Sequence, residues 1–359
     1  MMAPRKKDVL STVTDKLESA SDAVDRSASH LRQKTRLENI PSPARFILVV
    51  GSSLILSSTL FSLSSGITLG ELGNVSKHLD EWWEVGGLIV WKAVEVGLAW
   101  ALGFDGRDVS SFIFLTHLPT YALLVSFYNI RPTTVLASYA IILLSTSIPF
   151  MILRKPSSVH NLSGAPWDAV SNRSILQDRA ITIYTTLAAT AIFTVLLYIS
   201  YATWLPAQLV LHFINIPDIS TVHAGPAGLP VLFVALLPAG WAARDFLFAS
   251  SAGALASKSD STKKSPPASS SSSTTDRQGE YLISTIYRKT WASLSAKTRV
   301  LVSRTFVLAS MLVINTVVQV AGTVDGVDIE GASAWGSVWA VATFIVAGLF
   351  AWIEAIDGV

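Results

Sequence analysis

Long apolar stretches alternate with short polar gaps along this chain. Eight of the stretches come close to the ~20 residues with which an α-helix crosses ~30 Å of hydrocarbon. They are Phe46–Ser65, Gly86–Phe104, Val109–Phe127, Thr133–Leu153, Ala180–Trp204, Gly228–Ala249, Val300–Gly322 and Ala332–Ile353. The pattern predicts an all-α fold, a polytopic transmembrane helical bundle of about eight spans.

Composition supports the membrane class and excludes several chemistries. Apolar residues make up 50% of the 359 positions and charged residues only 14%, where soluble domains carry about 25% charged residues. The chain has no cysteine, which rules out disulfides, thiolate nucleophiles and cysteine-bound metals. Membrane lipids and proteins are the expected partners, and nucleic acid is not. The net charge of +2 conceals a strong asymmetry.

Basic residues gather in every second gap, which predicts an orientation. Nine of the 27 lysines and arginines precede Phe46, and eight lie between Lys258 and Arg299. Because cytosolic loops are enriched in such residues, both termini are expected in the cytosol. Span two is the weakest span, since Lys92 and Glu95 sit near its middle and it could instead lie along the interface. A crossing fits the charges better.

The segments outside the spans differ in character. Residues 1–45 form a basic tail with a thin apolar stripe, Val13, Leu17, Ala20, Val24 and Leu31. The stripe predicts an amphipathic cytosolic helix that contacts lipid or a partner helix, and the alternative is a solvated tail. Residues 46–153 hold spans one to four, 154–179 a cytosolic loop and 180–249 spans five and six. A disordered Ser-rich cytosolic loop fills 250–299, and 300–359 hold spans seven and eight and a short cytosolic end.

Ionisable and polar residues inside the spans are the candidate functional groups. Lys92 and Glu95 stand three residues apart on one helical face, and Arg304, Asn315 and Gln319 share a stripe of span seven. They are interpreted as helix-to-helix contacts, with the polar lining of a transport path as the alternative. His117 lies inside span three, where a hydrogen bond to a neighbouring helix is the expected role.

No motif points to a cofactor, a metal or a catalytic site. None of the six histidines makes an HxxxH or HExxH spacing, and no glycine-rich phosphate loop is present. The turn Asp105-Gly106-Arg107-Asp108 is too brief for lipid phosphotransfer chemistry. Asn74 is the candidate for glycosylation, because it opens a sequon in the first luminal gap close to the membrane. The sequons at Asn161 and Asn172 fall on the cytosolic side and should stay unmodified.

These observations favour a non-enzymatic multi-pass endomembrane protein, with the endoplasmic reticulum as the expected location. It would act as a scaffold, an assembly factor or a lipid-organising protein, with protein partners at the N-terminal tail and the Ser-rich loop. The first alternative is a transporter or channel that uses the polar residues of spans two and seven. A lipid-modifying enzyme centred on His117 is the least supported alternative.

Overall fold

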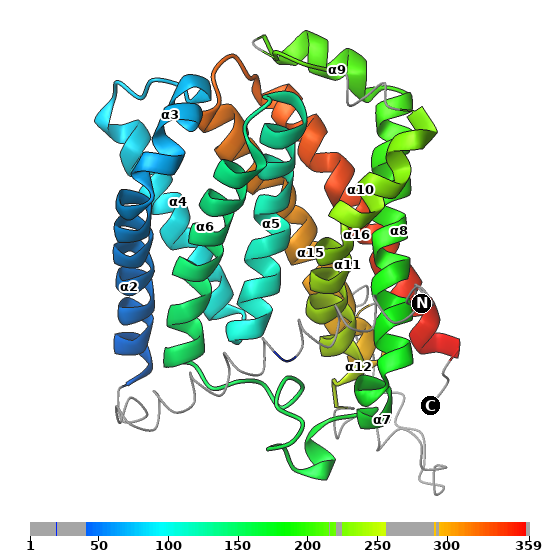
Figure 1. Cartoon of the computed structure of the whole chain (residues 1–359). Coiled ribbons are helices and arrows are strands. Elements are labelled where there is room, and N and C mark those ends of the chain that lie inside the picture. Colours follow the sequence, from blue (N-terminus) through cyan, green and yellow to red (C-terminus); the bar gives the residue numbers. More distant parts are fainter. Residues whose placement is uncertain are drawn as a thin grey trace, which may run out of the picture.

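A computed structural model describes residues 41–214, 216–219, 225–255 and 294–356, together with Ser19 and Trp291. Over these residues the fold is all-α: helices pack into one bundle (Figure 1), and only two isolated β-bridges, Ser76 with Val324 and Phe213 with Val327, join loops. The predicted all-α bundle is therefore confirmed. The predicted N-terminal amphipathic helix and the serine run lie outside the described residues.

Each of the eight apolar stretches is helical, and the sixth is divided into several helical segments. The long helices are α2 (Ser42–Leu63), α4 (Trp82–Ala101), α5 (Gly106–Phe127), α6 (Pro132–Leu153), α8 (Arg179–Ala202), α15 (Ala296–Thr316) and α16 (Ile329–Ile356). The sixth stretch is divided into α10 (Leu229–Ala235), α11 (Leu237–Ala243), the π-helical η5 (Arg244–Ala249) and α12 (Ser250–Ala252). A second π-helical segment, η7 (Val317–Ala321), extends α15.

Shorter helices lie at the two ends of the bundle. At one end are α3 (Ser65–Val75) and α9 (Leu205–His212), and at the other are η2 (Trp167–Ala169), α7 (Arg173–Gln177) and α12 (Figure 1). We call these the α9 end and the α7 end. The first residues of α2 and the last residues of α16 both lie at the α7 end (Figure 1).

Six described helices are long and apolar enough to cross a membrane, and a seventh span results if the bent pair is counted as one. The helix that falls short of the eight predicted is α4, because Glu84, Lys92 and Glu95 leave too many charges in its 20 residues. This helix nevertheless runs lengthwise in the bundle beside α2 rather than across its end (Figure 1). Lys92 and Glu95 pair with each other, and Glu95 also contacts His117 of α5, as described below.

The bend in the sixth stretch has a local cause. The two parts meet at Leu236 with an angle of 51°, and Pro238 follows in the first turn of α11. Proline lacks the N–H that would continue the helix and its ring clashes with the preceding turn. Consequently α10 has no buried residue, whereas all six residues of η5 are buried in the bundle.

Glycine allows α11 to approach α8 closely. A Cβ atom built on Gly240 would lie 2.1 Å from Thr190 Oγ1 and 2.6 Å from the backbone oxygen of Thr186. Such spacing leaves no room for a side chain. The contact holds the N-terminal half of α11, and with it η5, at a fixed distance from α8.

Candidate functional site

The ionisable residues of α4 and α5 meet inside the bundle. Lys92 Nζ lies 2.8 Å from Glu95 Oε2, and His117 Nε2 lies 2.8 Å from Glu95 Oε1. The side chains of Glu95 and His117 are 1% and 3% exposed, and that of Lys92 is 17% exposed. Both carboxylate oxygens thus have a partner, and one helix supplies the acid while its neighbour supplies the imidazole.

Asn315 joins α15 to the same region. Its Oδ1 accepts a hydrogen bond from Trp91 Nε1 at 2.9 Å, and its Nδ2 donates to the backbone oxygen of Thr116 at 3.0 Å. Trp91 and Thr116 directly precede Lys92 and His117 in the chain. Of the six intramembrane candidates, Lys92, Glu95, His117 and Asn315 are therefore brought together. We call these four residues the mid-bundle cluster.

The other candidates lie elsewhere. Gln319 is half-buried in η7, where its backbone oxygen accepts a hydrogen bond from Thr323. Asn74 is exposed in the last turn of α3, at the α9 end. Arg304 belongs to a second buried cluster, at the α7 end, which is described next.

Arg304 reaches from α15 to the first turn of α5. Its Nη1 donates to Asp108 Oδ1 at 2.5 Å and its Nη2 to Asp108 Oδ2 at 2.9 Å. The same guanidinium stacks over the rings of Phe104 and Phe246, with centroids 5.0 and 4.9 Å away. Two charge-assisted bonds and two cation–π contacts fix one side chain.

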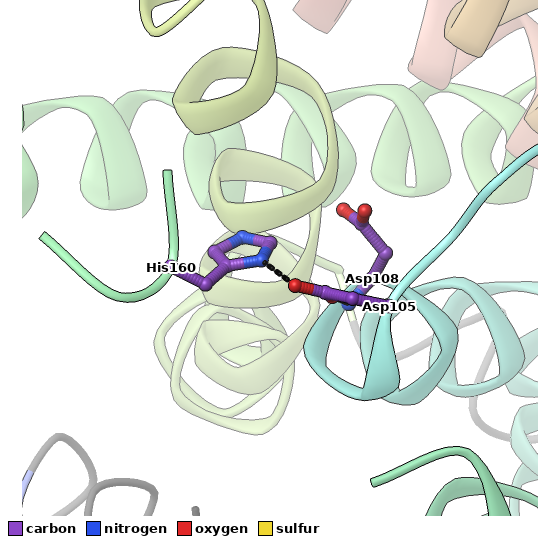
Figure 2. Close-up of side chains that lie close together, drawn as sticks. All are labelled: Asp105, Asp108 and His160. Atoms are coloured by element: carbon purple, nitrogen blue, oxygen red, sulfur yellow. Dashed lines mark hydrogen bonds and ion pairs between the residues drawn. The ribbon is translucent and has the colours of Figure 1, made fainter. Parts of the chain in front are cut away.

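Asp105 connects the start of α5 to the loop between α6 and α8. Its Oδ1 caps α5 by accepting from the backbone N–H of Asp108 at 2.8 Å. Its Oδ2 accepts from the backbone N–H of Ser157 at 2.7 Å and lies 2.8 Å from His160 Nδ1 (Figure 2). The loop following α6 is thus held against the bundle by one carboxylate.

The charges of this cluster shift the pKa values of both partners. Burial opposes ionisation of Asp105, but the charge of His160 and the hydrogen bonds outweigh it, so the pKa of Asp105 lies well below its usual range. Burial by itself would lower the pKa of His160. The charges of Asp105 and Asp245 outweigh burial and raise this pKa to about 9.

The second nitrogen of His160 has no hydrogen-bond partner. The imidazole side chain is 3% exposed, and Nε2 points away from Asp105 (Figure 2). The nearest described carboxylate atom to Nε2 is Asp245 Oδ2, 3.9 Å away. Ligand atoms of Asp105, Asp108 and His160 also lie within 4.8 Å of one another. We call Asp105, Asp108, His160 and Asp245 the α7-end cluster.

Local patterns do not reveal this cluster. Asp105 and Asp108 have the spacing of a helix cap, which is their local role, while His160 and Asp245 come 52 and 137 positions after Asp108. The π-helical turn that carries Asp245 is a structural hint, because such turns are frequent at functional sites, but it has no sequence signature. The helix packing brings the four residues together.

The fold and its apolar helices define an all-α bundle of the membrane-protein class. In a comparison with protein-family models, residues 178–318 are similar to the bouquet formation protein 3 C-terminal domain. The matched part begins at the first residue before α8 and ends within η7. No curated protein and no solved structure matches the chain.

Proposed function

We propose that this chain is a non-enzymatic, multi-pass membrane scaffold that takes part in bouquet formation, the process named in the description of the matched family. It is a protein of an endomembrane, the endoplasmic reticulum with its continuation around the nucleus. Both termini face the cytosol, and the α7 end is the cytosolic end. Protein partners bind the N-terminal tail and the Ser-rich loop, and lipids surround the bundle.

The main support for this proposal is that the polar atoms of Glu95 and Asn315 in the mid-bundle cluster all have partners inside the protein. A transport site must expose its polar groups to a solute during the cycle. Both oxygens of Glu95 and both polar atoms of Asn315 already have partners, and three of these four partners lie on neighbouring helices. Hydrogen bonds of this kind join transmembrane helices. The cluster thus favours a stable platform on which other proteins assemble.

The orientation has its own support. The first residues of α2 and the last residues of α16 lie at one end of the bundle (Figure 1), as an even number of crossings requires. The described bases Arg107, Arg154, Lys155, Arg173 and Arg179 lie in or beside the loops of that α7 end. Cytosolic loops are enriched in such residues.

The experiment is complementation of meiotic cells that lack this protein. The full chain should restore bouquet formation and localise to the endoplasmic reticulum and the nuclear rim. A chain without residues 1–40 should keep this localisation but restore bouquet formation poorly, since it lacks the partner-binding tail. The proposal would be refuted if the full chain failed to restore bouquet formation. It would also be refuted if cells lacking the protein formed normal bouquets.

A transporter is the second candidate, because three ionisable side chains meet in the mid-bundle cluster. Purified protein in liposomes distinguishes the two functions. A scaffold moves no protons across the vesicle wall, with or without the Glu95→Gln substitution. Proton flux that is lost in Glu95→Gln would favour the transporter.

A further inference from the structure

We propose that the α7-end cluster binds a divalent transition-metal ion of the zinc type, with His160 Nε2 and the carboxylate of Asp245 as its inner ligands. The proposal concerns a different part of the molecule from the mid-bundle cluster and does not depend on the scaffold function. The bound ion would attach the loop after α6 to η5 at the α7 end.

The first argument is the free imidazole nitrogen. His160 Nε2 is buried and has no hydrogen-bond partner, and an unsatisfied buried polar atom is costly. Its other nitrogen, Nδ1, lies 2.8 Å from Asp105 Oδ2. A histidine that binds metal through one nitrogen almost always donates its other N–H to a carboxylate or carbonyl. Asp105 is therefore placed as the positioning residue for His160.

The second argument is the spacing between His160 and Asp245. The atoms Nε2 and Oδ2 are 3.9 Å apart, too far for a hydrogen bond. Zinc bonds imidazole nitrogen at ~2.05 Å and carboxylate oxygen at ~2.1 Å, which sets these atoms ~3.4 Å apart at a tetrahedral angle and ~4.1 Å apart in line. The gap falls within that range, and a movement of about half an ångström gives the tetrahedral angle.

The third argument is that Asp245 lacks a strong partner among its described contacts. Ser111 Oγ lies 3.4 Å from Oδ2, and Arg244 Nη1 lies 3.8 Å from Oδ1. Neither is a short contact, although only 10% of the Asp245 side chain is exposed. The carboxylate sits on the π-helical turn η5, a type of segment that is frequent at functional sites.

Asp108 is available as a third, weaker ligand. One of its carboxylate oxygens lies within 4.8 Å of a ring nitrogen of His160, and both oxygens already accept hydrogen bonds from Arg304. Because Arg304 neutralises Asp108, the cluster is not strongly anionic. Zinc binds imidazole nitrogen after displacing its proton, which is released to solvent, whereas Ca²⁺ and Mg²⁺ need several oxygen ligands.

Zinc retention by the purified full chain tests the proposal. The protein in detergent is incubated with zinc chloride and desalted, and the zinc per chain is measured. One ion per chain is expected for the unmodified protein and none for His160→Gln or Asp245→Asn. Asp105→Asn should weaken binding about 10- to 100-fold, because it removes the carboxylate that orients His160 but leaves both inner ligands in place.

His212→Gln is the matched control. His212 also lies near two carboxylates, 3.8 Å from Asp328 and 4.0 Å from Glu330, but its side chain is 20% exposed. This variant should retain the ion. Zinc absent from the unmodified protein, or present equally in His160→Gln, would overturn the proposal.

Cobalt substitution provides a measurement that needs no variant. With CoCl₂ as the only added metal, the unmodified protein should develop the strong visible absorption of four-coordinate Co²⁺ with nitrogen and oxygen ligands. A spectrum equal to that of CoCl₂ in detergent buffer would contradict the site, even if the variants fail to fold.

Discussion

Asp108 and Arg304 form a two-bonded ion pair between α5 and α15, across 196 positions of the sequence. The pair joins the part of the chain that precedes the matched family region to that region itself. The Asp108 side chain is 2% exposed and that of Arg304 is 17% exposed. Neither charge therefore has ready access to solvent, and each depends on the other.

Replacing Arg304 is expected to destabilise the bundle strongly. Arg304→Met leaves the buried Asp108 carboxylate without its main donor, and the loss of one partner of a buried pair costs about 3–5 kcal/mol. Arg304→Lys should recover only part of this, because an ammonium group cannot make the two parallel bonds. Thermal unfolding of the purified protein measures both effects.

The exposed pair Lys77–Glu84 is the control for that prediction. Its atoms are 3.3 Å apart and the Lys77 side chain is 46% exposed, so Lys77→Met should change the stability little. An Arg304→Met protein as stable as the Lys77→Met protein would show that the buried pair contributes nothing.

In the mid-bundle cluster, one substitution should lower the stability of the protein more than the replacement of all three ionisable residues does. Glu95→Gln leaves Lys92 and His117 without their shared acid and should lower the unfolding midpoint. The triple variant Lys92→Met, Glu95→Met, His117→Leu should be more stable than Glu95→Gln, since apolar side chains can replace a buried charged group at little cost. A triple variant less stable than the single one would count against a structural role.

Two helical glycines should tolerate alanine very differently. Gly240→Ala forces a Cβ against α8, 2.1 Å from the Thr190 side-chain oxygen and 2.6 Å from the Thr186 backbone oxygen, and overpacking of this kind costs about 1–3 kcal/mol. Gly51→Ala in α2 meets nothing within 4 Å and should be neutral or slightly stabilising. Comparable unfolding midpoints of the two variants would contradict the close contact of α11 with α8.

Glycosylation at three sequons tests the proposed orientation. Asn74 lies at the α9 end, whereas Asn161 and Asn172 belong to the loop at the α7 end. Only Asn74 should carry a glycan, which a shift in gel mobility after glycosidase treatment would reveal and Asn74→Gln would abolish. Modification of Asn161 or Asn172 would show that the α7 end faces the lumen, opposite to the proposed orientation.

A second acceptor covers the case in which Asn74 is too close to the membrane for modification. Asp218→Asn creates the sequon Asn-Ile-Ser after α9, because Ile219 and Ser220 follow in the sequence. This acceptor should be glycosylated in an Asn74→Gln background. A chain that stays unmodified there would contradict a luminal α9 end.

Sequence and structure agree most closely on the helices. The predicted third stretch, Val109–Phe127, and the observed α5, Gly106–Phe127, end at the same residue, and the fourth stretch differs from α6 by one residue at its start. Such agreement is expected, because length and continuous hydrophobicity are local properties of the chain. The bend at Leu236 was not predicted, although Pro238 is its local cause.

Side-chain pairing was predictable only within one helix. Lys92 and Glu95 stand three residues apart, so helix geometry alone places them together. That His117 completes this pair, or that Arg304 binds Asp108, depends on how α4, α5 and α15 pack. The expected stripe of Arg304, Asn315 and Gln319 is divided among separate environments, because each residue meets a different neighbour along α15 and η7.

The amino-acid sequence by itself determined the all-α class and the approximate bounds of the apolar helices, since these follow from interactions between residues a few positions apart. Only the tertiary structure decided which buried charges share a partner. The α7-end cluster draws on α5, on the loop after α6 and on η5. Contacts between such distant segments arise from helix packing, and no local pattern records them.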